Sequence, residues 1–266
     1  PDTVAVVTGQ QAGLFGGPAY TVYKALTAAK LAHQLNESGI RAVPVFWLAT
    51  EDHDFQEIDH CHVYGRNRRP VRLSAMGGGR PGQPVGTIPI SQSPAAELRE
   101  TLSGLLYADA ISGLVEDTYT PGMTFGEAFQ RLMERRLAGF GFIFVDPMAP
   151  GFRRLAAPLL SEAAKRTTEL SAALRARGKE LEAAGYHAQV HFEESTSLFF
   201  LLEDGVRRTL RLKDGNYQLG DKVLRPEELA EQGAALSPTA LLRPVMQDYL
   251  LPTAAYVGGP AEIAYL

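Results

Sequence analysis

Nearly continuous apolar runs, separated by one long helical segment, dominate the pattern of hydrophobic and polar positions. The runs predict four core strands, at 3–9, 42–49, 142–146 and 254–258. They lack the strict alternation of half-buried strands, so we expect them in a parallel sheet that is covered on both faces. The segment from Pro18 to Ser38 predicts a helix between the first two strands, which indicates a right-handed βαβ unit.

The predicted helix carries one hydrophobic stripe. Val22, Leu26 and Ala29 recur at helical spacing, and we expect these residues to be buried. Lys24 and Lys30 fall outside the stripe, which places them on other faces. Lys24 lies one turn into the helix, so its side chain could reach back and add a positive charge to the loop before the helix.

Two stretches between the core strands have a different pattern. Residues 62–140 begin with short strand-like pieces and continue as helices. Residues 187–224 indicate an antiparallel meander, because Asp-Gly pairs at 204–205 and 214–215 separate β-rich runs and suit hairpin turns that need positive φ. We expect the meander to lie outside the parallel sheet, and a helical stretch at 152–184 to lead into it.

Composition and charge argue against several classes of partner. Hydrophobic residues make up 45% of the 266 residues and charged residues 21%, which is ordinary for a globular protein. The net charge of -4 gives no general attraction to nucleic acid, and every apolar run is far shorter than the ~20 residues that span a membrane. We therefore expect no nucleic-acid and no membrane partner. The one basic run, at 66–72, is interpreted as a solvated turn, with an anion site as the lesser alternative.

The single cysteine, Cys61, excludes an internal disulfide and fits a reducing compartment. No charged segment followed by an apolar one opens the sequence, so no signal peptide is visible. The cytoplasm is the expected location.

The loop after the first strand, TGQQAGLFGGPAYTVYK at 8–24, is rich in glycine. Its glycines, Gly9, Gly13, Gly16 and Gly17, fit neither the dinucleotide fingerprint nor the phosphate loop. Ligands of parallel sheets bind at the carboxyl ends of the strands, and missing side chains there would expose backbone N–H groups to an anion. The alternative is that the glycines serve only turn geometry and tight packing.

Acids and histidines crowd the loop after the second strand. Asp52, His53 and Asp54 form the centre of this cluster, which also contains Glu51, Glu57, Asp59, His60 and His62. A histidine between two carboxylates is oriented by them and stabilised in its charged form. The pattern points to general acid–base catalysis, to a transferring phosphate with bound Mg²⁺, or to a transition-metal site. We expect Asp52, His53 and Asp54 to be catalytic.

A tightly bound transition metal is the least expected of these uses. His60 and His62 share one face of a predicted strand and could supply two ligands. No further pair of His or Cys at ligand spacing completes a tetrahedral site, so we expect no such metal.

The sequence GGPA occurs at 16–19 and again at 258–261, each time after a predicted strand. Each copy opens a predicted helix with a proline, Pro18 or Pro260. If the two strands are neighbours, both helix N-termini should face one crevice and bind one anion. Glu262 lies in the first turn of the second helix, where capping is the structural alternative to ligand binding.

Three long motifs carry a family resemblance: VVTGQQAGLFGGPAYTVYKA at 6–25, PVFWLATEDHDFQEI at 44–58 and LLRPVMQDYLLPTAAYVGGPAEIAY at 241–265. They resemble the cysteine-adding enzymes of bacillithiol biosynthesis, a family described as cysteine ligases. The resemblance spans the whole chain. The chain departs from the family pattern in lacking an N-terminal segment and a C-terminal coiled coil, so we expect a fragment of a longer protein that forms a homodimer through that coiled coil.

The resemblance implies an α/β fold with a Rossmann-like parallel-sheet core, a connecting insertion that is mostly helical, and an antiparallel β-hairpin insertion. The predicted ranges are 1–61, 141–186 and 238–266 for the core, 62–140 for the helical insertion and 187–237 for the β-rich insertion.

The implied reaction joins the carboxyl group of cysteine to the amine of glucosaminyl-malate and forms bacillithiol. A free carboxylate is a poor electrophile, so ATP, with or without Mg²⁺, is the expected activator. The glycine loop suits a nucleotide phosphate and the malate carboxylates equally well. The expected substrate- or nucleotide-binding residues are Gly9, Gln10, Gln11, Gly13, Gly16, Gly17, Tyr20, Lys24, Gln247, Asp248, Tyr256, Gly258, Gly259 and Glu262. The alternative function is a non-catalytic module that binds an anionic sugar conjugate or a nucleotide.

Overall fold

The computed structural model describes residues 2–188, 190 and 192–265. Four residues within the predicted domain ranges lie outside the described residues: Pro1, Gln189, His191 and Leu266. The contacts divide the chain into two compact units, Pro1–Pro147 with Ala254–Val257 and Met148–Thr253 with Gly258–Leu266. The predicted core and insertion ranges stay a prediction.

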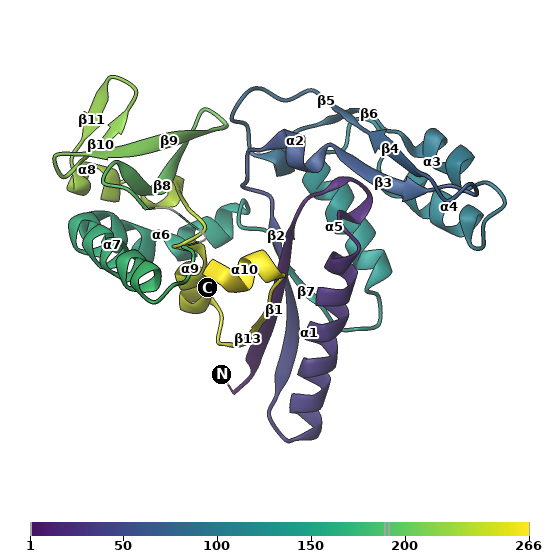
Figure 1. Ribbon diagram of the computed structural model, residues 1–266, viewed down its shortest axis with the longest axis horizontal. Helices are drawn as coiled ribbons and strands as arrows, with labels where there is room; N and C mark the ends of the chain where they lie inside the picture. The colour runs from purple at the N-terminus through teal and green to yellow at the C-terminus, as the bar shows by residue number, and fades with distance from the viewer. Residues whose placement is uncertain (1, 189, 191, 266) are drawn as a thin grey trace. The chain divides into compact units, whose positions relative to one another are not determined.

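A four-stranded sheet in the order β13-β1-β2-β7 forms the centre of the first unit (Figure 1). Its strands are β1 (Val4–Gln11), β2 (Ala42–Ala49), β7 (Ile143–Val145) and β13 (Thr253–Val257). β1 pairs in parallel with β2, and β2 pairs in parallel with β7. The four predicted core strands and the parallel core are thus confirmed.

Helix α1 (Tyr20–Glu37) lies along β1 and β2 in Figure 1. Its buried residues are Thr21, Lys24, Ala25, Ala28, Ala29 and Ala32. Leu26, predicted to be buried, is 36% exposed, and Lys24, predicted on another face, is buried. Ala29 is buried and Lys30 is exposed, as predicted, so the stripe is confirmed in part and wrong at Leu26 and Lys24. Small alanines let the helix approach the sheet closely, and Lys24 finds a buried acceptor there.

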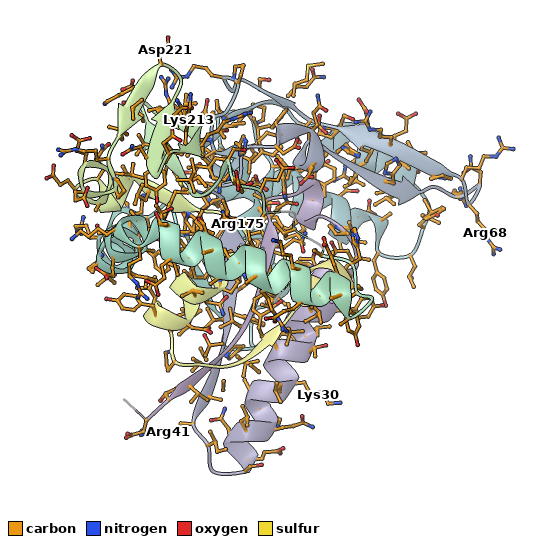
Figure 2. All side chains as sticks on the ribbon, turned by 60° about the vertical axis from the view of Figure 1, so that its left-hand side comes forward. Lys30, Arg41, Arg68, Arg175, Lys213 and Asp221 are labelled. Carbon is orange, nitrogen blue, oxygen red and sulfur yellow. The ribbon has the colours of Figure 1, made fainter. Side chains whose placement is uncertain are left out.

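The segment between β2 and β7 adds two antiparallel strand pairs and a group of helices. Its elements are α2 (Phe55–Ile58), β3 (His60–Tyr64), β4 (Pro70–Ser74), β5 (Met76–Gly77), η2 (Val85–Thr87), β6 (Ile90–Gln92), α3 (Ala95–Leu102), α4 (Ala108–Thr118) and α5 (Phe125–Arg136). β3 pairs with β4 and β5 with β6. Leu73, Ile88 and Phe125 belong to the apolar core that these elements enclose. The basic run forms the exposed tip of the β3–β4 hairpin, where Arg68 projects outward (Figure 2).

A five-stranded antiparallel sheet in the order β11-β10-β9-β8-β12 organises the second unit. The unit contains α6 (Pro150–Lys165), α7 (Thr167–Ala183), β8 (Thr196–Glu203), β9 (Val206–Lys213), β10 (Asn216–Leu219), β11 (Lys222–Leu224), α8 (Pro226–Ala230), η3 (Gly233–Ala235), β12 (Leu236–Pro238), α9 (Arg243–Leu250) and α10 (Pro260–Tyr265). Because this sheet is separate from the parallel one, the predicted position of the meander is confirmed.

Two local predictions for the second unit have different outcomes. Both Asp-Gly turns have positive φ at each residue, 52° and 71° at 204–205 and 50° and 77° at 214–215, as a two-residue hairpin requires. The single helical stretch predicted at 152–184 is instead two helices, because Arg166 leaves helical geometry between α6 and α7. Across the described part of the chain, no helix combines the length and the apolar character needed to cross a membrane.

Candidate functional site at the strand ends

The loops that follow β1 and β2 meet through the side chain of Gln11. Its Nε2 donates hydrogen bonds to Asp52 Oδ2 and to Glu57 Oε2, each at 2.6 Å. Gln11 and Ala49 are paired at the ends of the two strands, so the parallel register itself brings the two loops to one edge. A single amide thus links the glycine loop to the acidic cluster.

Asp52 in turn contacts His53. The backbone N–H of His53 donates to Asp52 Oδ1 at 2.7 Å, and His53 Nδ1 lies 3.7 Å from the same oxygen. The imidazole is 35% exposed and therefore accessible to a ligand. Asp54 is the N-cap of α2, where its Oδ1 accepts from the backbone N–H of Gln56 at 3.1 Å. The Asp52 carboxylate therefore lies beside His53, whereas Asp54 fixes the start of the next helix. We call Gln11, Asp52, His53 and Glu57 the strand-end site.

Lys24 is buried against the glycine loop and is 6% exposed. Its Nζ donates to the backbone oxygen of Gly9 at 2.7 Å and lies 5.3 Å from the centre of the Tyr20 ring. The side chain does reach back from the helix, as expected, and its acceptor is the backbone of β1. The ammonium group thereby ties the first turns of α1 to the end of that strand.

At each glycine position of the loop, a side chain would clash or would strain the backbone. A Cβ on Gly9 would lie 2.8 Å from the backbone oxygen of Trp47, its partner on β2, and a Cβ on Gly13 would lie 2.9 Å from Gly17 Cα. Gly16 and Gly17 have φ of 99° and 70°, which residues with a side chain rarely adopt. Turn geometry and close packing thus account for all four glycines.

Three glycine N–H groups of this loop donate hydrogen bonds within it. Those of Gly13, Gly16 and Gly17 donate to loop carbonyls at 2.7 to 3.1 Å. The hydroxyl of Tyr119 donates to the Gly13 oxygen at 3.1 Å and anchors the turn, and burial raises the pKa of Tyr119. These contacts contradict the expectation that the glycines expose N–H groups to an anion. A 3-10 turn, η1 (Leu14–Gly16), precedes α1, which begins at Tyr20 and not at Pro18.

Neighbouring strands supply polar residues that the sequence analysis did not single out. Thr50 follows β2, is 2% exposed and donates a short hydrogen bond to Asp146, which directly follows β7. Thr8 on β1 donates to the backbone oxygen of Val257 on β13 at 2.8 Å. These bonds hold the four strands together near the strand-end site. Asp146 ends a predicted strand, so the strand-end rule applied to all four strands would have found it.

The two histidines of the acidic cluster that follow α2 lie on β3. His60 Nδ1 lies 2.8 Å from Asp59 Oδ1, and the rings of His60 and His62 meet edge to face at 5.6 Å. Over the residues that the structure describes, no group of three or more His, Cys, Asp or Glu residues could hold a metal ion. Cys61 lies between the histidines, and burial raises the pKa of its thiol to about 11. The thiol is therefore protonated at neutral pH and is a weak nucleophile.

Gln247 and Asp248 lie on α9 in the second unit. Gln247 is 2% exposed and accepts from Arg243 Nη1 at 3.0 Å. Its Nε2 lies 3.4 Å from Thr253 Oγ1 and 3.5 Å from Asp248 Oδ1. These contacts fix the position of the Gln247 side chain, and the ligand-binding role of both residues stays a prediction.

The second GGPA turn also belongs largely to the second unit. Helix α10 begins at Pro260, as predicted, and the backbone N–H of Gly259 donates to Glu262 Oε2 at 2.7 Å. Glu262 therefore caps its helix, which is the structural alternative given for it. Gly258 precedes this cap, and Tyr256 lies on β13 in the first unit. The strands before the two GGPA turns, β1 and β13, are neighbours as that prediction required.

The parallel strands β1, β2 and β7 with helix α1 against them define a Rossmann-like domain, and the loops after β1 and β2 meet at the edge where such domains bind their ligands. Residues 1–266 match the family model described as "Bacillithiol biosynthesis BshC, N-terminal Rossmann-like domain". The chain belongs to this family.

Curated relatives with the name "Putative cysteine ligase BshC" are similar over the whole chain. The protein of Solibacter usitatus (strain Ellin6076) is 51% identical over 265 residues, which cover 100% of this chain and 50% of that protein. The protein of Koribacter versatilis (strain Ellin345) is 40% identical, with 98% of this chain and 50% of that protein covered. The protein of Salinibacter ruber is 38% identical, with 100% and 50% covered. The chain spans about half the length of the curated relatives it matches.

Proposed function

We propose that this chain belongs to a ligase that joins the carboxyl group of cysteine to the amine of glucosaminyl-malate and forms bacillithiol, with ATP as the activator. Family membership and the name of the relatives support the reaction. The observation that carries the assignment is the series of contacts from Gln11 through Asp52 to His53. It sets an accessible imidazole beside a carboxylate that is itself held in place.

Amide formation requires an activated carboxyl group. ATP transfers a phosphoryl or an adenylyl group to the carboxylate of cysteine, which leaves ADP or pyrophosphate. The amine then attacks the acyl carbon, the bond to the activating group breaks, and phosphate or AMP departs while the amine loses a proton. A base near the attacking nitrogen therefore accelerates the second step.

His53 is the proposed base. A nitrogen of the imidazole can accept the proton that the attacking amine loses, and the carboxylate of Asp52 lies 3.7 Å from Nδ1 of this ring. Asp54 contributes by capping α2, which fixes the backbone that follows His53. Carboxylates such as Asp52 and Glu57 also suit Mg²⁺ that arrives with ATP, because Mg²⁺ in such sites takes one or two carboxylates beside the phosphates.

The glycine loop is proposed to bind an anionic group, either an ATP phosphate or a malate carboxylate. Gln10 is half-buried and Tyr20 is 47% exposed, so both side chains are accessible to a ligand. Lys24 stabilises the loop, because its positively charged Nζ donates a hydrogen bond to the Gly9 carbonyl oxygen. In this proposal the glycines and Lys24 shape the loop, and the side chains of Gln10 and Tyr20 contact the ligand.

An assay of a protein that carries this chain at the full length of its relatives tests the proposal. Incubation with cysteine, glucosaminyl-malate and ATP should give a thiol with the mass of bacillithiol, and omission of any one of the three should abolish it. Mass spectrometry detects the thiol, and the nucleotide product distinguishes an acyl phosphate (ADP) from an acyl adenylate (AMP). Binding of glucosaminyl-malate or ATP without any turnover would instead support the non-catalytic module.

The full-length protein is further proposed to act in the cytoplasm as a homodimer. The reducing environment suggested by the single cysteine supports the location. The proposed dimer contact is a coiled coil in the half of the relatives' length that this chain does not match. Light scattering after gel filtration should give twice the monomer mass, and a monomeric species with full activity would contradict the proposal.

A further inference from the structure

A cavity of about 340 Å³ lies in the second unit, between α7 and the antiparallel sheet. One wall is α7, where Ser171 and Arg175 are one helical turn apart and share a face. The opposite wall is the end of β9 with the rigid turn after it, which contributes Lys213 and Asp214. Glu194, before β8, completes the charged lining. Figure 2 labels Arg175 on α7 and Lys213 on the sheet.

The hydroxyl of Ser171 is a buried polar group on the wall of this cavity. Ser171 lines the cavity and is 2% exposed, and its Oγ has no hydrogen-bond partner among the described residues. Buried hydroxyls in folded proteins are almost always paired. An unpaired hydroxyl has given up its hydrogen bonds to water on folding and has formed none with the protein. A polar ligand in the cavity would supply the missing partner.

The charged side chains of the lining are also unpaired. Arg175 and Lys213 provide two positive charges and Glu194 and Asp214 two negative charges, yet these four side chains form no ion pair within the described part of the chain. The lining thus presents charges of both signs to one cavity. The space between them can therefore hold a molecule with charges of both signs.

We propose that this cavity binds a small zwitterion, a free α-amino acid in which one ammonium and one carboxylate group lie a few bonds apart. The carboxylate is bound by Arg175, Lys213 and the Ser171 hydroxyl, through charge-assisted hydrogen bonds. The ammonium group is bound by Glu194 and Asp214. A simple anion would meet the two carboxylates of the lining, and a simple cation would meet the two basic groups, so only a zwitterion satisfies both sets. This site does not depend on the proposed ligase reaction.

Calorimetric titration of the protein tests whether a ligand needs both charges. The titrants are L-alanine, propionate, which keeps only the carboxylate, and ethylammonium, which keeps only the ammonium group. A panel of the other free L-amino acids follows. At least one amino acid should bind at least about tenfold more tightly than both propionate and ethylammonium, since each of these two loses one set of charge-assisted bonds. Propionate that binds as tightly as every amino acid would overturn the proposal, and so would the absence of any amino-acid binding.

Charge-neutralising variants assign the binding to this cavity. Arg175→Gln should weaken amino-acid binding at least about tenfold, whereas Arg177→Gln, which removes an exposed charge on the same helix, should leave it unchanged. Glu194→Gln should weaken amino-acid binding and leave propionate binding no weaker, with Glu193→Gln as the matched control. Glu194 is exposed, so its variant remains informative if Arg175→Gln does not fold. Equal effects of the variants and their controls would contradict the site.

Discussion

At the strand-end site of the first unit, polar groups are paired with one another, whereas the cavity of the second unit leaves polar groups unpaired. Gln11 bridges two carboxylates, and Lys24 nearby is bonded to the Gly9 oxygen. Ser171 and Arg175 in the cavity have no partner in the described part of the chain. A paired network fixes its geometry before a substrate arrives, which catalysis requires. Unpaired groups keep their hydrogen-bonding capacity for a ligand, at a cost in stability.

The largest effect is expected where the paired network meets the substrate. His53→Asn should lower kcat of the full-length enzyme about 10²–10⁴-fold, because the network would remain but the base would be lost. The melting temperature should change little, since His53 is 35% exposed. His33→Asn, in an exposed pair with Glu37 on α1, is the control and should retain activity. Steady-state kinetics and thermal unfolding, measured on the same variants, distinguish a catalytic from a structural role of His53. Parallel losses of activity and stability would assign it a structural role.

A smaller but still large effect is expected from Lys24. Lys24→Met should lower the free energy of unfolding by about 2 kcal/mol, because the Gly9 carbonyl would lose a charged, buried donor. Lys30→Met removes the same charge from an exposed position of the same helix and should stay within about 0.5 kcal/mol of the wild type. Denaturant unfolding measures both. An unchanged stability with weakened anion binding would show that Lys24 serves the ligand directly.

In the cavity, a substitution is expected to raise the free energy of unfolding, not to lower it. Ser171→Ala should raise the free energy of unfolding by about 1 kcal/mol, because it removes a buried hydroxyl that has no partner. Ser161→Ala on α6 is the matched control and should lower it by about 1 kcal/mol, because Ser161 Oγ donates to the Ala230 oxygen at 2.6 Å. A loss of stability in both variants would mean that the Ser171 hydroxyl is satisfied in the free protein.

A pH dependence of stability is also expected, and it arises from Cys61. Burial raises the pKa of this thiol from 9.0 to about 11, so the folded state keeps its proton where the unfolded state loses it. The resulting stabilisation is complete below pH 9 and is lost as the pH rises to about 11. Unfolding free energies of the wild type and of Cys61→Ala should therefore converge across this range. A constant difference between them would show that burial does not perturb the thiol.

Much of the fold could be predicted because its signals are local. Continuous apolar runs marked the four core strands, and the Asp-Gly pairs marked two hairpin turns, since few other dipeptides accept positive φ at both residues. Prediction failed where a tertiary contact outweighs a local preference. Lys24 is polar and was placed away from the sheet, but a buried carbonyl accepts its hydrogen bond.

The residues of the candidate site that are close in the sequence could be predicted, and the contacts between distant residues could not. The cluster of Asp52 and His53 stands out because both follow a strand and lie side by side in the sequence. The bridge from Gln11 to Asp52 joins residues that are 41 positions apart, and the bond from Thr50 to Asp146 joins residues 96 apart. No spacing rule identifies such pairs, because the strand order and the register decide them.

The sequence by itself determined the α/β class, the order of the main elements, the family and the identity of the acidic cluster, because periodicity, turn chemistry and long motifs depend on neighbouring residues. Only the tertiary structure decided that the Asp52 carboxylate lies beside His53 while Asp54 caps a helix, and that loop carbonyls accept from the N–H groups of Gly13, Gly16 and Gly17. It also decided that Ser171 and Lys213 line one cavity. Hydrogen bonds and ion pairs act over a few ångströms in space, and the distance between two residues along the chain does not fix that separation.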